Sequence, residues 1–295
     1  MERYGFIFAG QGAQYAGMGA RVAENSPAAA TVFKKADEVL GFSISDLCFK
    51  GTLADLTPCA MCQPAIYTVS MAFYEAYRVE HPDVKPVVCG GLSLGEYAAA
   101  CVAGVFDFET GLKLVAERGR LMDKCCQNYP GGMAAVIGAD SKDIEAVCQA
   151  AGVDVANYNC PGQIVISGEK TKLETASTAL SPLAKRVIPL TVAGAYHSRL
   201  MNEAANEFGR ILDAIGMSAP RCGFVQNVTG GTVDSPDEIR SNLKAQVASS
   251  VRWEQCARTM MESCTRFLEF GPGSVLSGFA KRISRDFPAE PAIVD

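Results

Sequence analysis

The chain has 295 residues, 48% of them hydrophobic, and its formal net charge at pH 7 is −5. This length and apolar content can build one large core, or one core with a smaller subdomain, and the acidic balance argues against nucleic acid as the main partner. No apolar run approaches membrane-spanning length and the first residues do not resemble a signal peptide, so we expect a cytoplasmic protein with no membrane partner.

The first predicted element is a strand that runs into a glycine-rich turn, Gly10-Gln11-Gly12. A dinucleotide fingerprint would need its third glycine where Tyr15 stands, and the lysine and Ser/Thr of a phosphate-binding P-loop are missing. Two interpretations stay open. The segment is either an ordinary strand-to-helix turn or a turn whose backbone N–H groups help to form an oxyanion hole.

The next motif, Cys59-Ala-Met-Cys62, has the spacing of a redox or metal site. No second pair and no nearby histidine completes a tetrahedral zinc site, so we expect no metal and no cofactor. Partly buried neutral thiols, at the start of a helix that Pro64 helps to begin, are the better interpretation. Because nothing indicates a secreted chain, all 12 cysteines are expected to be reduced.

A serine at a predicted strand-to-helix turn is the strongest chemical signal in the sequence. The segment Gly91-Leu-Ser93-Leu-Gly95 follows a predicted strand at 86–90 and precedes a predicted helix at 96–103 that is rich in small residues. A serine flanked by glycines at such a turn forms a nucleophile elbow, with its hydroxyl exposed and a helix N-terminus aimed at developing negative charge. The pattern fixes only three positions, so a chance match is the alternative; the flanking elements favour the elbow.

Two arginines lie on the next predicted helix, at about residues 106–124. Arg118 and Arg120 are two positions apart and cannot share a helix face, so one is expected to point inward and the other to solvent. A planar guanidinium can hold a carboxylate through two parallel hydrogen bonds, which suits an inward arginine. The solvated position fits Arg120 better.

The element order predicts an α/β protein of two parts. Strand–helix alternation at the start indicates a hydrolase-like large domain with a mostly parallel sheet. Between residues 133 and 190 the predicted order is strand–helix–strand–strand–helix–strand, which is the ferredoxin-like motif. We therefore expect a large domain from 1–128 and 194–295, with a ferredoxin-like small subdomain at 129–193 inserted into it. The cleft between the two parts is the expected active site.

A general base for the serine is found by elimination, since histidine is the usual base and the chain has only two. His81 lies in a polar loop segment before the elbow strand and is interpreted as solvated. His197 lies in a turn directly after a predicted apolar strand at 186–190, where functional groups are often mounted. A structural histidine is the alternative, but His197 is the better candidate for the base.

Together these motifs resemble malonyl-CoA:acyl carrier protein transacylases, which are related to the acyltransferase domains of polyketide and fatty acid synthases. Each motif is weak alone, and their order and spacing make the resemblance specific. The motifs run in order from about residue 5 to about residue 282: Gly10-Gln11-Gly12, Gln63-Pro64, Gly91 to Tyr97, Arg118 to Met122, Asn157 with Pro161-Gly162-Gln163, Ala195 to Ser198, Gln246 with Val251-Arg252-Trp253, and Glu269 to Gly273.

The resemblance implies a role for each matching residue. Ser93 would be the nucleophile and His197 the base, and the backbone N–H groups of Gln11 and Leu94 would form the oxyanion hole. Arg118 would hold the free carboxylate of the malonyl group. Gln246 would orient His197 through its backbone carbonyl, in place of a triad carboxylate. Tyr196 resembles the malonyl-type form of its motif, because a large side chain there crowds an α-methyl branch.

Two positions depart from the family pattern. Leu92 stands where histidine or glutamine is usual, which removes a polar group from the pocket wall and bears on acyl preference. Ser250 stands where proline is common, close to Gln246. Two other functions stay open. A serine thioesterase or other hydrolase would let water take the acyl group, and a non-catalytic carrier-binding module would need a degenerate site.

The resemblance also implies two partners, malonyl-CoA and a holo acyl carrier protein. Carrier proteins are typically acidic, as is this chain, so docking is expected to depend on local basic patches. Two Lys-Arg pairs match positions where similar transacylases carry basic residues: Lys185-Arg186 and Lys281-Arg282. We expect them to flank the cleft mouth of a monomeric enzyme; two solvated surface clusters are the alternative.

Overall fold

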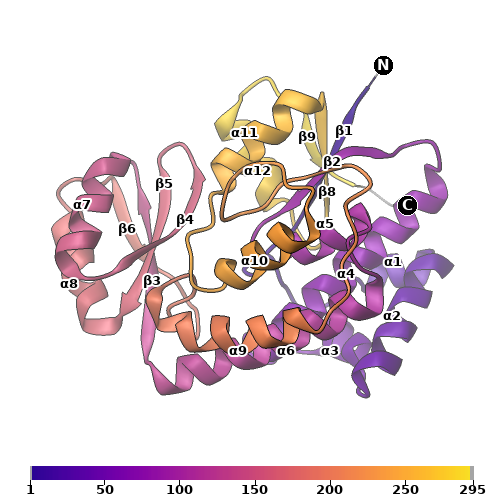
Figure 1. Ribbon diagram of the computed structural model, residues 1–295, viewed down its shortest axis with the longest axis horizontal. Helices are drawn as coiled ribbons and strands as arrows, with labels where there is room; N and C mark the ends of the chain where they lie inside the picture. Colours follow the sequence, from indigo (N-terminus) through magenta and orange to yellow (C-terminus); the bar gives the residue numbers. More distant parts are fainter. Residues whose placement is uncertain (1, 293–295) are drawn as a thin grey trace.

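Two β-sheets organise the computed structural model, which describes residues 2–292 (Figure 1). The larger sheet has the order β7-β2-β1-β8-β9, and all its described strand pairs are parallel. The smaller sheet has the order β4-β5-β3-β6 and is antiparallel. The strands are β1 (Tyr4–Phe8), β2 (Pro86–Gly91), β3 (Gly131–Ile137), β4 (Asp154–Cys160), β5 (Gln163–Glu169), β6 (Arg186–Pro189), β7 (Gly223–Phe224), β8 (Arg266–Phe270) and β9 (Ala289–Pro291).

The larger sheet is covered on both faces, as parallel sheets require. Phe6 and Phe8 of β1 are buried in one apolar cluster, whereas Ile7 between them is buried in a second cluster with Trp253 and Leu276. The alternation follows from the two-residue period of a strand. Eleven helical segments belong to this part of the chain: α1 (Ala20–Asn25), α2 (Pro27–Leu40), α3 (Ile44–Lys50), α4 (Cys59–Glu80), α5 (Gly95–Ala103), α6 (Phe108–Asn128), the short 3₁₀ helix η1 (Arg199–Met201), α9 (Asn202–Asp213), α10 (Pro236–Gln246), α11 (Trp253–Ser263) and α12 (Val275–Ile283).

The smaller sheet and two helices, α7 (Ser141–Ala151) and α8 (Lys170–Leu180), form the other part of the molecule. Their order along the chain is β3-α7-β4-β5-α8-β6, so the predicted ferredoxin-like order and the mostly parallel main sheet are both confirmed. β6 differs from the predicted apolar strand. It pairs only with β3 at the sheet edge, and Ile188 and Pro189 are therefore exposed. We propose boundaries at 129 and 193 for this subdomain.

Backbone hydrogen bonds join the two parts directly. The N–H of Tyr158 in β4 donates to the carbonyl of Val251 at 2.9 Å, and the N–H of Val251 donates to the carbonyl of Ala156 at 2.8 Å. Val251 follows α10 and precedes α11, so the smaller sheet is tied to the segment that follows Gln246. β4 is thereby joined to the segment between α10 and α11.

The start of α4 differs from the prediction in one detail. The helix begins at Cys59 because the carboxylate of Asp123 accepts hydrogen bonds from the N–H groups of Cys59 and Ala60, at 2.9 and 2.8 Å. Pro64 lies inside the helix, so the expectation that it helps to begin it is wrong. Burial raises the pKa of the Cys59 thiol to about 11, which keeps this thiol neutral at ordinary pH.

Candidate active site

The serine turn has the geometry of a nucleophile elbow between β2 and α5. Ser93 has φ = 51°, and within residues 2–292 only His197, with φ = 55°, is another non-glycine residue at positive φ. Such backbone costs about 1–3 kcal/mol per residue and concentrates at functional sites. Glycine is required on both sides of Ser93 because other backbone atoms lie too close to leave room for a side chain. A Cβ at Gly91 would lie 2.1 Å from the carbonyl carbon of Gly95, and one at Gly95 would lie 2.1 Å from the carbonyl oxygen of Phe8.

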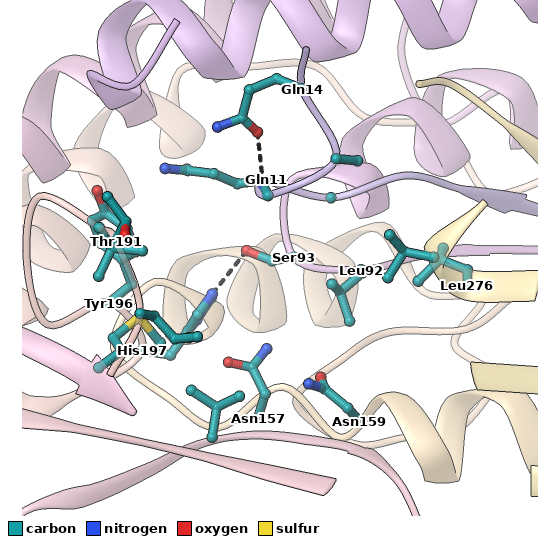
Figure 2. A pocket seen from close by; sticks show the side chains of 18 of the residues that line it. Gln11, Gln14, Leu92, Ser93, Asn157, Asn159, Thr191, Tyr196, His197 and Leu276 are labelled. Atoms are coloured by element: carbon teal, nitrogen blue, oxygen red, sulfur yellow. Dashed lines mark hydrogen bonds between the residues drawn. The ribbon is translucent and has the colours of Figure 1, made fainter. Parts of the chain in front are cut away.

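The elbow brings Ser93 directly to His197 (Figure 2). Ser93 Oγ lies 2.8 Å from His197 Nε2, and His197 Nδ1 lies 2.9 Å from the backbone carbonyl oxygen of Gln246. A carbonyl oxygen only accepts hydrogen bonds, so Nδ1 carries the proton and Nε2 is free to accept the serine proton. The arrangement is that of a serine with its general base, oriented by a backbone carbonyl rather than a carboxylate.

The environment keeps this imidazole neutral. His197 is buried, and burial, followed by the positive charge of Arg118, lowers its pKa from 6.5 to about 4. A neutral imidazole is the form that can take a proton from a hydroxyl group.

We therefore expect His197 to remain unprotonated until the pH falls to about 4. Lowering the pH through this value protonates Nε2 and removes the base, whereas raising it from there has no further effect on the imidazole. The measurement is an NMR titration of the His81→Ala variant, in which His197 is the one remaining histidine. A ring signal that titrates around the ordinary value of 6.5 would contradict the assigned burial and charge environment.

Arg118 is the inward arginine of α6, with 1% of its surface exposed. Nη1 donates to Gln63 Oε1 at 2.8 Å, and Nη2 donates to Ser93 Oγ and Gln246 Oε1, each at 3.0 Å. Its Nε has no hydrogen-bond partner, and no carboxylate of residues 2–292 lies within ion-pair distance. A buried cation without a counter-charge is costly, so this guanidinium suits an anionic ligand. Arg120 is exposed and pairs with Glu117 at 2.9 Å.

A cavity of about 310 Å³ opens in front of the serine, between the N-terminal turn, the elbow, β4, the segment after β6, and α12. Asn157 and Asn159 of β4 point toward it in Figure 2, and Asn159 Oδ1 is buried without a hydrogen-bond partner. Leu92 and Leu276 form part of its apolar wall. The mixture of apolar walls and few polar groups is typical of a small-molecule pocket. Its lining residues are Gly10, Gln11, Gly12, Ala13, Gln14, Thr57, Leu92, Ser93, Met122, Met133, Asn157, Asn159, Val165, Leu190, Thr191, Val192, Tyr196, His197, Val275, Leu276 and Phe279.

The two backbone N–H groups expected to bind the oxyanion belong to Gln11 and Leu94. Gln11 lines the cavity, and Leu94 follows Ser93 at the start of α5. Within residues 2–292 neither backbone N–H donates to another protein group, so both are available to a ligand. The turn that carries Gln11 is fixed locally, because Gln14 Oε1 accepts a hydrogen bond from the N–H of Gly12 at 2.7 Å (Figure 2).

The two basic pairs lie outside the cavity wall. Lys185, Arg186 and Lys281 are exposed, but Arg282 is engaged: Nη1 donates to Gln163 Oε1 at 2.6 Å and Nη2 to the carbonyl of Pro161 at 3.1 Å. Arg282 thus ties the end of α12 to the turn between β4 and β5. Within the described chain, no group of three or more His, Cys, Asp or Glu side chains is arranged to hold a metal ion.

Sequence reasoning missed two residues that contact the elbow or its neighbours. Asn227 lies between β7 and α10, and its amide contacts the backbone of Gly91 and Ser93. Glu96 lies within the motif from Gly91 to Tyr97, and its carboxylate is fully buried, which raises its pKa to about 7. A charged residue in the first turn of a helix of small residues is the available signal for Glu96, whereas the sequence around Asn227 carries none.

None of the helices in residues 2–292 is long and apolar enough to cross a membrane. The family model "Acyl transferase domain" matches residues 5–286. The malonyl CoA-acyl carrier protein transacylase of Bacillus subtilis is 38% identical, over 97% of this chain and 92% of the relative. The polyketide biosynthesis malonyl CoA-acyl carrier protein transacylase PksC of the same organism is 37% identical, over 97% of this chain and 99% of the relative.

A solved structure with the same fold is PlMCAT:AntF, a malonyl-transacylase in complex with its type II polyketide acyl-carrier protein. It superposes with a TM-score of 0.93 and 35% identity, over 99% of this chain and 96% of that one. The enzyme from Bartonella henselae, an acyl-carrier-protein-S-malonyltransferase, gives a TM-score of 0.93 at 36% identity, over 98% of this chain and 95% of that one. The chain therefore belongs to the acyl transferase family, among the malonyl CoA-acyl carrier protein transacylases.

Proposed function

We propose that the chain transfers a malonyl group from malonyl-CoA to the phosphopantetheine thiol of an acyl carrier protein through an acyl-enzyme on Ser93. The observation that carries the proposal is the contact of Ser93 Oγ with both a neutral imidazole and a buried guanidinium that has no carboxylate of residues 2–292 within ion-pair distance. The first pairing activates a nucleophile, and the second selects an acyl group that bears a carboxylate.

The reaction proceeds in two matched halves. His197 Nε2 takes the proton of Ser93 Oγ as the oxygen attacks the thioester carbonyl, and the N–H groups of Gln11 and Leu94 stabilise the oxyanion. The intermediate collapses, the C–S bond breaks, and the imidazolium returns the proton to the departing thiolate of coenzyme A. The thiol of the carrier protein then enters the same cavity and reverses the steps, which leaves Ser93 free.

The other groups of the site have supporting roles in this proposal. The carbonyl of Gln246 fixes the imidazole tautomer, and Arg118 holds the malonyl carboxylate. Tyr196, which lines the cavity, disfavours an α-methyl branch on the acyl group. The amides of Asn157 and Asn159 suit the amide groups of a pantetheine arm. We expect the enzyme to act as a monomer, with no nucleic acid or membrane partner.

Intact mass spectrometry tests this function directly. The protein is mixed with malonyl-CoA, its mass is measured, and holo carrier protein is then added. A malonyl adduct that persists and moves to the carrier supports transacylation. An adduct lost to water with no transfer identifies a hydrolase, and no adduct at all identifies a binding module. The carbonyl partner of His197 Nδ1 disfavours a hydrolase triad, which uses a carboxylate there.

For docking, we propose that the acidic carrier protein contacts Lys185, Arg186 and Lys281. They lie on or beside elements that reach the cavity: Leu190 follows β6 and Val275 begins α12. Both of these apolar side chains are partly exposed, at 37% and 41%, and would meet the partner beside the basic groups.

Reversing the charge of Lys185, Arg186 and Lys281 to glutamate is expected to raise the KM for holo carrier protein, because steering by local charge is lost. Added salt should reduce the difference between the variant and the unsubstituted protein. Arg282 is left unchanged because its contacts with Gln163 and Pro161 make its loss structural as well as electrostatic. The acylation step from malonyl-CoA should change less, although coenzyme A phosphates share some of these charges.

The matched control reverses three exposed basic residues on α1, α2 and α6, Arg21, Lys34 and Lys113. It changes the net charge by the same amount, and none of the three residues lines the cavity. Carrier kinetics that respond equally to both triple variants would show that Lys185, Arg186 and Lys281 are ordinary surface residues.

A further inference from the structure

Both peptide units that flank Ser93 are held by amide side chains. The N–H of Ser93 donates to Asn227 Oδ1 at 2.6 Å, and Asn227 Nδ2 donates to the carbonyl of Gly91 at 2.8 Å. On the other side, Gln246 Nε2 donates to the carbonyl of Ser93 at 3.0 Å. All of these groups are buried, and Asn227 and Gln246 are fully so.

The need for such partners follows from the backbone of the elbow. At φ = 51°, Ser93 interrupts the passage from β2 to α5, so its N–H has neither a strand partner nor a helix partner. A buried N–H without a partner would cost about 1–3 kcal/mol. One amide that accepts from Ser93 and donates to Gly91 spans the turn and satisfies both groups.

Asn227 is itself held in place from α5. Its backbone N–H donates to Glu96 Oε2 at 2.7 Å, and Glu96 Oε1 accepts from Gln226 Nε2 at 3.0 Å. The backbone carbonyl of Asn227 accepts from the N–H of Arg252 at 3.0 Å. The elbow is therefore locked to a third segment of the chain, the one between β7 and α10.

The second peptide unit concerns the oxyanion directly. In a trans peptide the C=O and the N–H point in opposite directions. The carbonyl of Ser93 and the N–H of Leu94 belong to one such unit. Two donors to that carbonyl, Gln246 Nε2 at 3.0 Å and the backbone N–H of Glu96 at 3.1 Å, therefore set the direction of the Leu94 N–H. The two amides, with the first turn of α5, hold the nucleophile and one donor to the oxyanion in place.

We propose that Asn227, held by Glu96, is a positioning residue for acyl transfer: it keeps the Ser93 backbone in the conformation that places Oγ 2.8 Å from His197 Nε2. This inference rests on the proposed function, since it assigns the reaction to Ser93. Asn227 neither reacts nor contacts the acyl group in this proposal. Its loss is therefore expected to change the rate of acylation rather than the binding of substrate.

Asn227→Ala is expected to slow single-turnover acylation by malonyl-CoA on the order of a hundredfold, the typical effect of a small misplacement of a reacting atom. The KM for malonyl-CoA should change little, because Asn227 does not line the cavity. Acylation at the rate of the unsubstituted protein would overturn the proposal, as would a loss expressed entirely in KM.

Asn227→Asp gives a sharper test, because the side chain keeps its volume. A protonated carboxyl group offers the same donor and acceptor as the amide, whereas a carboxylate cannot donate to the Gly91 carbonyl. We expect near-normal acylation at acidic pH and a progressive, reversible loss as the pH rises. The ionisable groups nearest the change are Glu96, Arg118, His197 and Cys256, and all of them are present in the unsubstituted protein measured in parallel.

The matched control is Asn206→Asp, because Asn206 is exposed on α9 and lies outside the network of Ser93, Asn227, Glu96 and Gln226. Its pH profile should follow that of the unsubstituted protein. An Asn227→Asp profile that also follows it would overturn the proposal even if Asn227→Ala proves too unstable to study. Failure of the proposed function is distinguishable, because then the unsubstituted protein itself would form no adduct on Ser93.

Discussion

Replacing Ser93 with alanine is expected to abolish the malonyl adduct, because no other hydroxyl group lies 2.8 Å from the imidazole of His197 in the described chain. His197→Ala is expected to slow adduct formation by at least about a thousandfold, since nucleophile and base act as a unit. The measurement is the rate at which the intact mass increases after mixing with malonyl-CoA. The serine variant sets the background for the histidine variant.

His81→Ala is the matched control for the base. His81 is exposed at the end of α4, where its ring lies 4.3 Å from that of Tyr77, and it contacts no residue of the site. Its loss should leave acylation nearly unchanged. If His81→Ala proved as damaging as His197→Ala, the assignment of the base would be wrong.

The elbow was predictable because its signal is local. Two glycines at fixed spacing around Ser93, between an apolar strand and a helix of small residues, are read directly from neighbouring positions. The close contacts at Gly91 and Gly95 give the physical reason for the pattern. The same holds for the ferredoxin-like order, which depends only on the succession of elements and was recovered in full.

Contacts between residues that are far apart in the sequence could not be predicted from local patterns. Asn227 reaches Ser93 across 134 positions of the chain, and nothing in its own neighbourhood distinguishes it from a turn residue. The sequence around Arg282 indicates a surface charge, yet Arg282 donates a hydrogen bond to Gln163, next to the turn between β4 and β5 and 119 positions away. Such contacts depend on how the two sheets pack, which a single sequence does not reveal.

The predictions for β6 and α4 were partly wrong for a different reason. The local sequence indicates the type of an element, but not how the rest of the fold surrounds it. The apolar residues of β6 indicate a strand correctly but not its place at the sheet edge, where Ile188 and Pro189 are exposed. Pro64 suggests a helix start, yet the capping carboxylate of Asp123 lies on α6 and lets the helix begin earlier, at Cys59.

The choice of acyl group is expected to depend on Arg118. Truncating one partner of a buried charge pair costs about 2–5 kcal/mol, so Arg118→Ala should lower malonyl transfer by about thirty- to several-thousandfold. Acetyl transfer should be spared or improved, because an acetyl group has no carboxylate to leave unpaired. The measurement compares kcat/KM for malonyl-CoA and acetyl-CoA in the variant and the unsubstituted protein.

Arg118 also contacts Ser93 Oγ and Gln246 Oε1, so its loss could disturb the nucleophile as well as the acyl group. Acetyl transfer separates the two effects, because it needs the nucleophile but not the carboxylate site. Arg120→Ala is the matched control: it removes an exposed guanidinium from the same helix and should leave both transfers unchanged. An Arg118→Ala variant that still preferred malonyl over acetyl would rule out the carboxylate role, and equal losses of both transfers would make Arg118 a support of Ser93 instead.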